Sequence, residues 1–106
     1  MKVEMTDDLK ELYETGQCKR YKDVSRNNLL LTGFARAIKI MEQVPSIDSL
    51  KEISFLHYER LRYQLSGKSS VRLSNQYVHR LIFTETEDGL QVELIEIDDT
   101  HYGNKQ

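Results

Sequence analysis

The spacing of apolar residues changes along this chain, and that change most constrains its fold. Between residues 30 and 44, apolar side chains recur at the three- and four-residue intervals of one helix face. After residue 56 the interval becomes two, which is typical of strands with one buried face. The helical stripe consists of Leu30, Phe34, Ala37, Ile38, Met41 and Val44. The sequence therefore predicts an α+β fold, with helices first and an antiparallel sheet after them.

Capping and breaking residues divide the first half into elements. Thr6 can cap a first helix, Thr15-Gly16 can end it, and Pro45 stops a second helix. The expected order is an edge strand over 2–5, a helix over 6–14, a loop over 17–22, a helix from 23 or 25 to 44, and a short helix over 47–53.

The second half is predicted to be a four-stranded antiparallel meander with the helices packed on one of its faces. The clearest hairpin turn is Glu87-Asp88-Gly89. Ile95 and Ile97 break phase with Val92 and Leu94, so the last strand is expected to be central and buried on both faces. The strands are expected to begin at 59, 71, 80 and 90, and the first of them is expected to run to residue 65.

Length and composition limit the class of protein. A chain of 106 residues supports one domain, residues 1–106, with a modest core. No apolar run approaches the roughly 20 residues of a membrane span, and the first residues lack a signal-peptide pattern. We therefore expect a cytoplasmic protein without a membrane partner.

The charge of the chain is segregated. The net charge is only −2, but residues 56–80 carry five cations against the single carboxylate of Glu59, and residues 85–99 carry seven carboxylates and no cation. A basic stretch can attract phosphate locally in a protein that is acidic overall. A mixed-charge surface on an exposed sheet face remains the plain alternative.

The basic stretch places candidate site residues on neighbouring strands. Arg62, Arg72 and Arg80 recur where they could converge, and arginine offers planar donor forks suited to phosphate. With Glu59 and His101 they are expected to line one concave surface on the face that the helices leave open. Asp98 and Asp99 with His101 do not make a convincing ligand set, and neither a metal nor another cofactor is expected.

Several motifs, in order, resemble those of RelE/ParE-superfamily toxins, closest to the HigB and YoeB branches. Leu9-Lys-Glu-Leu-Tyr-Glu-Thr-Gly16 and Ser70-Val-Arg-Leu-Ser-Asn-Gln-Tyr77 resemble HigB motifs. Glu59-x-Leu-x-x-x-Leu-Ser-Gly67, His79-Arg-Leu-Ile-Phe83 and the closing His101-Tyr102 are similar to the YoeB pattern. The resemblance covers nearly the whole chain and implies a RelE-like fold.

The resemblance also implies an activity and roles for single residues. It implies a type II toxin that cleaves mRNA on the ribosome, with Glu59 as general base, Arg80 as transition-state arginine and His101 as general acid. It further implies RNA or phosphate contacts by Arg62, Lys68, Arg72 and Tyr102.

The implied partners are a cognate antitoxin, expected to be of the helix-turn-helix type, and the ribosome with its mRNA. A homodimer or a toxin–antitoxin heteromer is the expected assembly. Two alternatives stay open: a ParE-like toxin that binds a protein target such as DNA gyrase without chemistry, and a degenerate member that only makes interactions. The first stays open because the fold alone does not separate it from a nuclease, and the acidic pI of about 5.9 fits the second.

Overall fold

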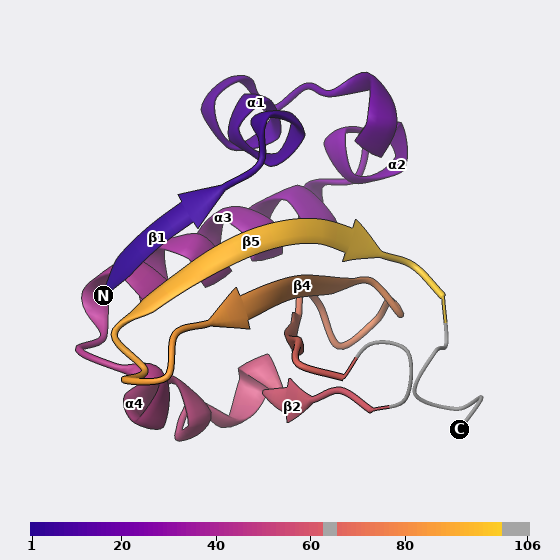
Figure 1. Cartoon of the computed structure of the whole chain (residues 1–106). Coiled ribbons are helices and arrows are strands. Elements are labelled where there is room, and N and C mark those ends of the chain that lie inside the picture. Colours follow the sequence, from indigo (N-terminus) through magenta and orange to yellow (C-terminus); the bar gives the residue numbers. More distant parts are fainter. Residues whose placement is uncertain (63–65, 101–106) are drawn as a thin grey trace.

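The structure is a computed structural model, and it describes residues 1–62 and 66–100. A five-stranded sheet carries helices on one face (Figure 1). The elements in chain order are β1 (Lys2–Met5), α1 (Asp7–Thr15), the 3-10 turn η1 (Lys19–Tyr21), α2 (Lys22–Ser25), α3 (Asn28–Gln43), α4 (Ile47–Lys51), the 3-10 turn η2 (Ser54–Leu56), β2 (Glu59–Arg60), β3 (Ser69–Arg72), β4 (Arg80–Glu85) and β5 (Gln91–Asp98).

The strand order is β1-β5-β4-β3-β2. β2 to β5 form the expected antiparallel meander, and β1 adds an edge strand that runs parallel to β5. The regular part of β2 is only two residues, Glu59–Arg60, where a strand over 59–65 was expected. Residues 63–65 of that expected strand lie outside the described part of the chain.

The long helix expected from residue 23 or 25 is interrupted. α2 ends at Ser25, and Asn27 then takes an extended conformation with φ −117° and ψ 110°. Its side-chain oxygen accepts hydrogen bonds from the backbone N–H groups of Leu29 and Leu30 at 3.0 and 3.2 Å, which caps a new helix. α3 ends at Gln43, and Val44 is extended as expected for the residue before a proline.

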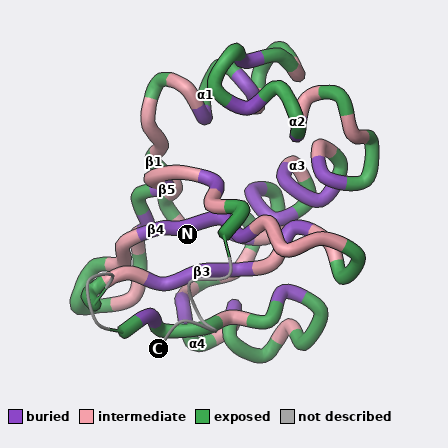
Figure 2. Tube along the Cα trace, turned by 90° about the vertical axis from the view of Figure 1, so that its right-hand side faces the viewer, coloured by how far each residue is buried: buried purple, intermediate pink, exposed green. Residues whose placement is uncertain are grey.

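The core lies between the helices and one face of the sheet. Phe34, Ala37, Ile38 and Met41 of α3 are fully buried, and so is Phe83 of β4. Figure 2 shows this layer as the buried stretches that run along α3, β3 and β4. No helix in the described residues is long and apolar enough to cross a membrane.

α3 approaches the end of β3 so closely that only glycine fits at one position. A Cβ atom built on Gly33 would lie 1.9 Å from the carbonyl oxygen of Leu73 and 2.8 Å from its carbonyl carbon. Both of these atoms belong to the backbone, so no side-chain rotation can relieve the overlap. Gly33 thereby sets the distance between α3 and the strand that ends at Arg72.

The prediction that β5 is buried on both faces is wrong. The register pairs Ile82 with Glu96 and Phe83 with Leu94, so Ile95 is an extra residue in a β-bulge. The bulge shifts the phase of the strand, which is why Ile97 faces the core together with Leu94. β5 is central because it pairs with both β1 and β4, but its other face carries the exposed Glu93.

Candidate active site on the open face of the sheet

The strand register identifies the side chains on the face opposite the helices, which we call the open face. Directly paired residues of neighbouring strands point to the same side of a sheet. Arg72 pairs with Arg80, and Arg80 pairs with Asp98, so these three form a row across β3, β4 and β5. Glu59 pairs with Ser70 in the adjacent row.

Arg80 lies at the centre of this arrangement. Its Nε donates a hydrogen bond to Ser70 Oγ at 2.7 Å, and its guanidinium donates another to the backbone carbonyl of His57. The same guanidinium lies 3.7 Å from Glu59 Oε1. Arg80 is buried, with 9% of its surface exposed. Arg80 is therefore not a freely exposed surface side chain, because Ser70 and the end of η2 enclose it.

The backbone at His57 is adapted to this contact. His57 has φ 50° and ψ 54° and is the single non-glycine residue with positive φ among the described residues. The left-handed conformation is unfavourable for a residue with a side chain, by roughly 1–2 kcal/mol. It ends η2 and leaves the His57 carbonyl directed at Arg80. Sequence reasoning assigned His57 no task, because a carbonyl contact leaves no signature in side-chain chemistry.

Ser70 is the second contact that the sequence did not reveal. Its side chain is fully buried although it lies on the open face. A buried hydroxyl needs a hydrogen-bond partner, and Arg80 provides one. Ser70 thus fixes the position of the Arg80 guanidinium.

Arg72 and Arg80 place two positive charges side by side. Like charges directly across a strand pair repel each other. Among the described residues, Glu59 is the only carboxylate within 4.0 Å of either guanidinium, and it touches Arg80 alone. Arg72 Nε is buried and has no hydrogen-bond partner in the described part of the chain. Arg72 is half-buried, so its exposed part can offer positive charge to an anion such as a phosphodiester, beside the enclosed Arg80.

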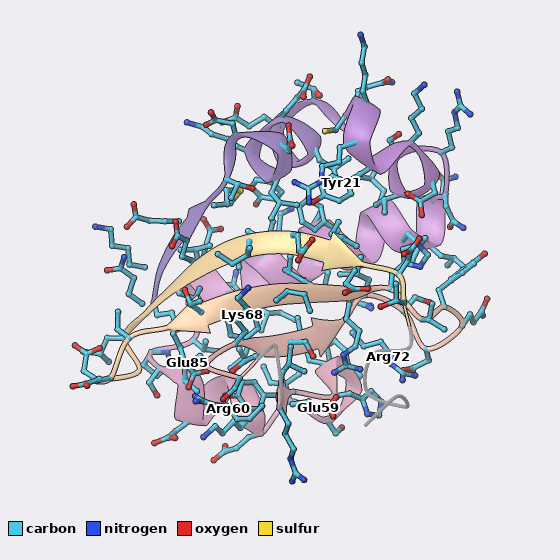
Figure 3. The ribbon with its side chains drawn as sticks, turned by 45° about the vertical axis from the view of Figure 1, so that its right-hand side comes forward. Tyr21, Glu59, Arg60, Lys68, Arg72 and Glu85 are labelled. Carbon is cyan, nitrogen blue, oxygen red and sulfur yellow. The ribbon has the colours of Figure 1, made fainter. Side chains whose placement is uncertain are left out.

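Glu59 is positioned to take part in chemistry beside this anion site. Its side chain is 51% exposed, so a bound molecule can reach it. A carboxylate next to paired arginines can accept a proton from a hydroxyl while the arginines stabilise negative charge on phosphate oxygens. In Figure 3, Glu59 and Arg72 lie to the right of Glu85.

The remaining predicted site residues lie less close to this centre. Lys68 is half-buried, and its carbonyl accepts a hydrogen bond from Leu61 N at 2.9 Å. Leu61 covers Ile82 on the open face. Arg62 is exposed and forms no ion pair with a described residue; alternation places Leu61, not Arg62, on the side of Glu59. His101 and Tyr102 lie outside the described residues.

A second polar cluster lies on the helix side of β2, β3 and β4, where Arg60 pairs with Ser69 and Ser69 with the core residue Phe83. Glu85 Oε2 accepts hydrogen bonds from Tyr58 and Ser69 at 2.7 and 3.0 Å, and Glu85 Oε1 lies 2.8 Å from Arg60. Burial and the Glu85 carboxylate raise the pKa of Tyr58. These contacts satisfy the partly buried Glu85 carboxylate, so Arg60 is bound there and does not reach the open face.

The structure resembles solved structures of bacterial toxins. A YoeB/ParE toxin from Agrobacterium tumefaciens matches with a TM-score of 0.57 and 17% identity, over 95% of this chain and 100% of that one. YafQ from E. coli strain BL21(DE3) matches with a TM-score of 0.58 and 12% identity, over 99% and 98%. A chain of the heterotetrameric YoeB–YefM toxin–antitoxin complex from Staphylococcus aureus matches with a TM-score of 0.54 and 17% identity, over 96% of this chain and 98% of that one.

These similarities show the fold. No protein-family model matches the sequence, and no curated protein matches it. The expected RelE-like α+β fold, with helices on one face of an antiparallel meander and an N-terminal edge strand, is confirmed.

Proposed function

We propose that this chain is the toxin of a bacterial type II toxin–antitoxin system and that it cleaves mRNA on the ribosome. The observation that carries the proposal is the contact of Glu59 with Arg80, beside Arg72, which has no carboxylate partner among the described residues. The fold of the solved YoeB/ParE and YafQ toxins supports it.

The proposed reaction is attack of an RNA 2′-hydroxyl on the adjacent phosphate. Glu59 takes the proton of the 2′-hydroxyl, the 2′-oxygen bonds to phosphorus, and the bond from phosphorus to the 5′-oxygen breaks. Arg80 and Arg72 stabilise the charge on the non-bridging oxygens. His101, by its resemblance to the terminal histidine of YoeB-like toxins, protonates the departing 5′-oxygen. DNA lacks the 2′-hydroxyl and cannot react in this way.

The experiment compares point variants with the wild type in a translation extract. Cleavage of mRNA is mapped by primer extension for the wild type, Glu59→Gln and Arg72→Ala. Both variants are expected to lose on the order of a hundredfold in rate or more, because each removes a group that acts in the transition state. Glu87→Gln and Arg26→Ala change exposed residues away from the open face and serve as matched controls that keep full activity.

The outcome also separates the two mechanisms for a toxin. If Glu59→Gln and Arg72→Ala still arrest growth when expressed, and no mRNA cleavage is detected with the wild type, the protein acts by binding a target such as DNA gyrase. Equal cleavage by the wild type and both variants would instead show that the open face is not the active site.

The proposal includes a cognate antitoxin and a cytoplasmic location, where ribosomes and mRNA are found. An antitoxin segment with carboxylates could neutralise Arg72 and cover the open face. We expect Arg72→Glu to weaken binding of the protein encoded beside this chain's gene. Glu87→Gln is a suitable control, whereas Glu85 is not, because its carboxylate is bound by Tyr58, Ser69 and Arg60.

A further inference from the structure

Three potential metal ligands from distant parts of the sequence meet on the helix side of the sheet. They are Asp23 of α2, His79 just before β4, and Asp99 just after β5, and their ligand atoms all lie within 4.8 Å of one another. His79 Nε2 lies 2.7 Å from Asp23 Oδ2. We propose that Asp23, His79 and Asp99 form a binding site for a divalent transition metal, with Zn²⁺ as the best match.

The ligand types favour zinc over magnesium. Zn²⁺ is bound by histidine nitrogen and aspartate oxygen at roughly 2.0–2.2 Å, and three protein ligands plus water make a common open site. Magnesium prefers oxygen ligands in strict octahedral geometry and keeps most of its water. One imidazole with two carboxylates is therefore a poor magnesium site and a suitable zinc site.

The surroundings leave room for an ion and its water. The cluster opens into a hollow of about 180 Å³, whose lining also includes Arg20, Tyr21 and Ile97. Tyr21 is labelled in Figure 3, where it lies on the helix side of the sheet, away from Glu59 and Arg72. The ligand atoms lie between 2.7 and 4.8 Å from one another, and the distance between two ligands of a tetrahedral zinc ion falls within this range. Small changes in side-chain conformation are therefore enough to place all three ligands around one ion.

The charges are compatible with a cation. The cluster contains two carboxylates, those of Asp23 and Asp99. Arg20 is the cation in the hollow's lining, and it is paired with Asp8 at 3.5 Å and with Glu96 at 3.2 Å. Two carboxylates thus remain to balance the ion.

The imidazole is already held in place. The His79 side chain is only 12% exposed, and Tyr77 packs edge-on against it with ring centroids 6.1 Å apart. Nδ1 has no partner among the described residues, so Nε2 is the nitrogen directed at the cluster. A bound ion would tie α2 to the start of β4 and the end of β5. His79 precedes Arg80 and Asp99 follows Asp98 in the sequence. The bound ion would therefore lie next to the paired residues Arg80 and Asp98, on the other side of the sheet.

The proposal is tested by titrating metal-free protein with Zn²⁺ against a chromophoric chelator. We expect one ion per chain for the wild type, and at least about tenfold weaker binding for His79→Gln and for Asp99→Asn. Thermal unfolding supplies an independent readout, since a ligand that binds the folded state raises Tm. Zn²⁺ is expected to raise Tm of the wild type but not of His79→Gln, and Mg²⁺ at the same concentration to raise neither.

Two controls keep the result specific. His57→Gln removes another histidine of the chain, and Glu11→Gln removes a ligand of a second group, Asp8, Glu11 and Cys18, whose ligand atoms also lie within 4.8 Å of one another. Both are expected to bind zinc as the wild type does. The proposal is wrong if the wild type binds no zinc, or if His79→Gln and Asp99→Asn bind as tightly as the wild type. These readouts need no RNA cleavage, so they stand apart from the proposed function.

Discussion

Replacing Arg80 by alanine is expected to destabilise the fold markedly, whereas the same change at its neighbour Arg72 is not. Arg80 donates hydrogen bonds to Ser70 and to the His57 carbonyl. Hydrogen bonds to a charged group contribute about 1.5–3 kcal/mol each, and a buried hydroxyl left without its partner costs about 1–3 kcal/mol. The pair with the half-exposed Glu59 adds only about 0–1 kcal/mol.

With partial compensation by entering water, we expect Arg80→Ala to lower the free energy of unfolding by about 3 kcal/mol. For a chain of this size each kcal/mol lowers Tm by about 4–8 °C, which makes the change easy to measure. Arg72 pairs with Arg80 across the strands, but its Nε has no described partner, so Arg72→Ala should stay within about 1 kcal/mol of the wild type.

The assay is urea unfolding followed by circular dichroism, with both variants measured beside the wild type. Equal destabilisation by the two substitutions would refute the reasoning, because only Arg80 has hydrogen-bond partners among the described residues. The result matters for activity measurements too. Loss of cleavage in Arg80→Ala is informative only at temperatures where the variant is still folded, so Glu59→Gln is the cleaner probe of chemistry.

Local contacts lead to three further predictions. Asn27→Ala removes the cap of α3 and should lower the free energy of unfolding by about 1 kcal/mol, measured by urea unfolding. Burial and Glu85 raise the pKa of Tyr58, so its contribution to stability is complete below pH ~10 and is lost as the pH rises further; Tyr58→Phe should flatten that alkaline decline. Partial burial acts to raise the pKa of Asp23, but its hydrogen bond with His79 and other contacts lower it overall, so its contribution is complete above pH ~4 and is lost on further acidification. The stability difference between wild type and Asp23→Asn, measured without metal, should shrink below that pH.

The periodicity of the sequence was sufficient to predict the arrangement of the fold. Helical spacing from Leu30 to Met41 and alternation in the second half placed α3 and the meander correctly. Two local features were predicted wrongly: the start of a new helix at Asn27 left no mark in the apolar spacing, and the phase break at Ile95 was interpreted as burial on both faces instead of a bulge. Asn27 captures two backbone N–H groups and starts a new helix, and the extra residue Ile95 bulges out of β5.

The candidate site was only partly predictable. Alternation of side chains along β3 and β4 was enough to predict that Arg72 and Arg80 share one face of the sheet. The structure pairs them directly across the two strands. It could not reveal that Arg80 is enclosed, since the enclosing groups are a serine hydroxyl and a backbone carbonyl. The meeting of Asp23 with His79 was also invisible, because α2 and β4 are 56 positions apart in the chain at this contact.

The contact between Gly33 and the Leu73 backbone has a consequence for tracing the ancestry of this chain. At 12–17% identity to the solved toxins, sequence alignments through the helices have little to anchor them. The 1.9 Å overlap that any side chain would create gives one fixed correspondence between helix and strand. A distant relative that packs these elements in the same way must carry glycine at the aligned position. A relative with a larger residue there must hold its helix farther from the strand. The residue aligned with Gly33 therefore distinguishes distant sequences with close packing of helix and strand from those with wider packing.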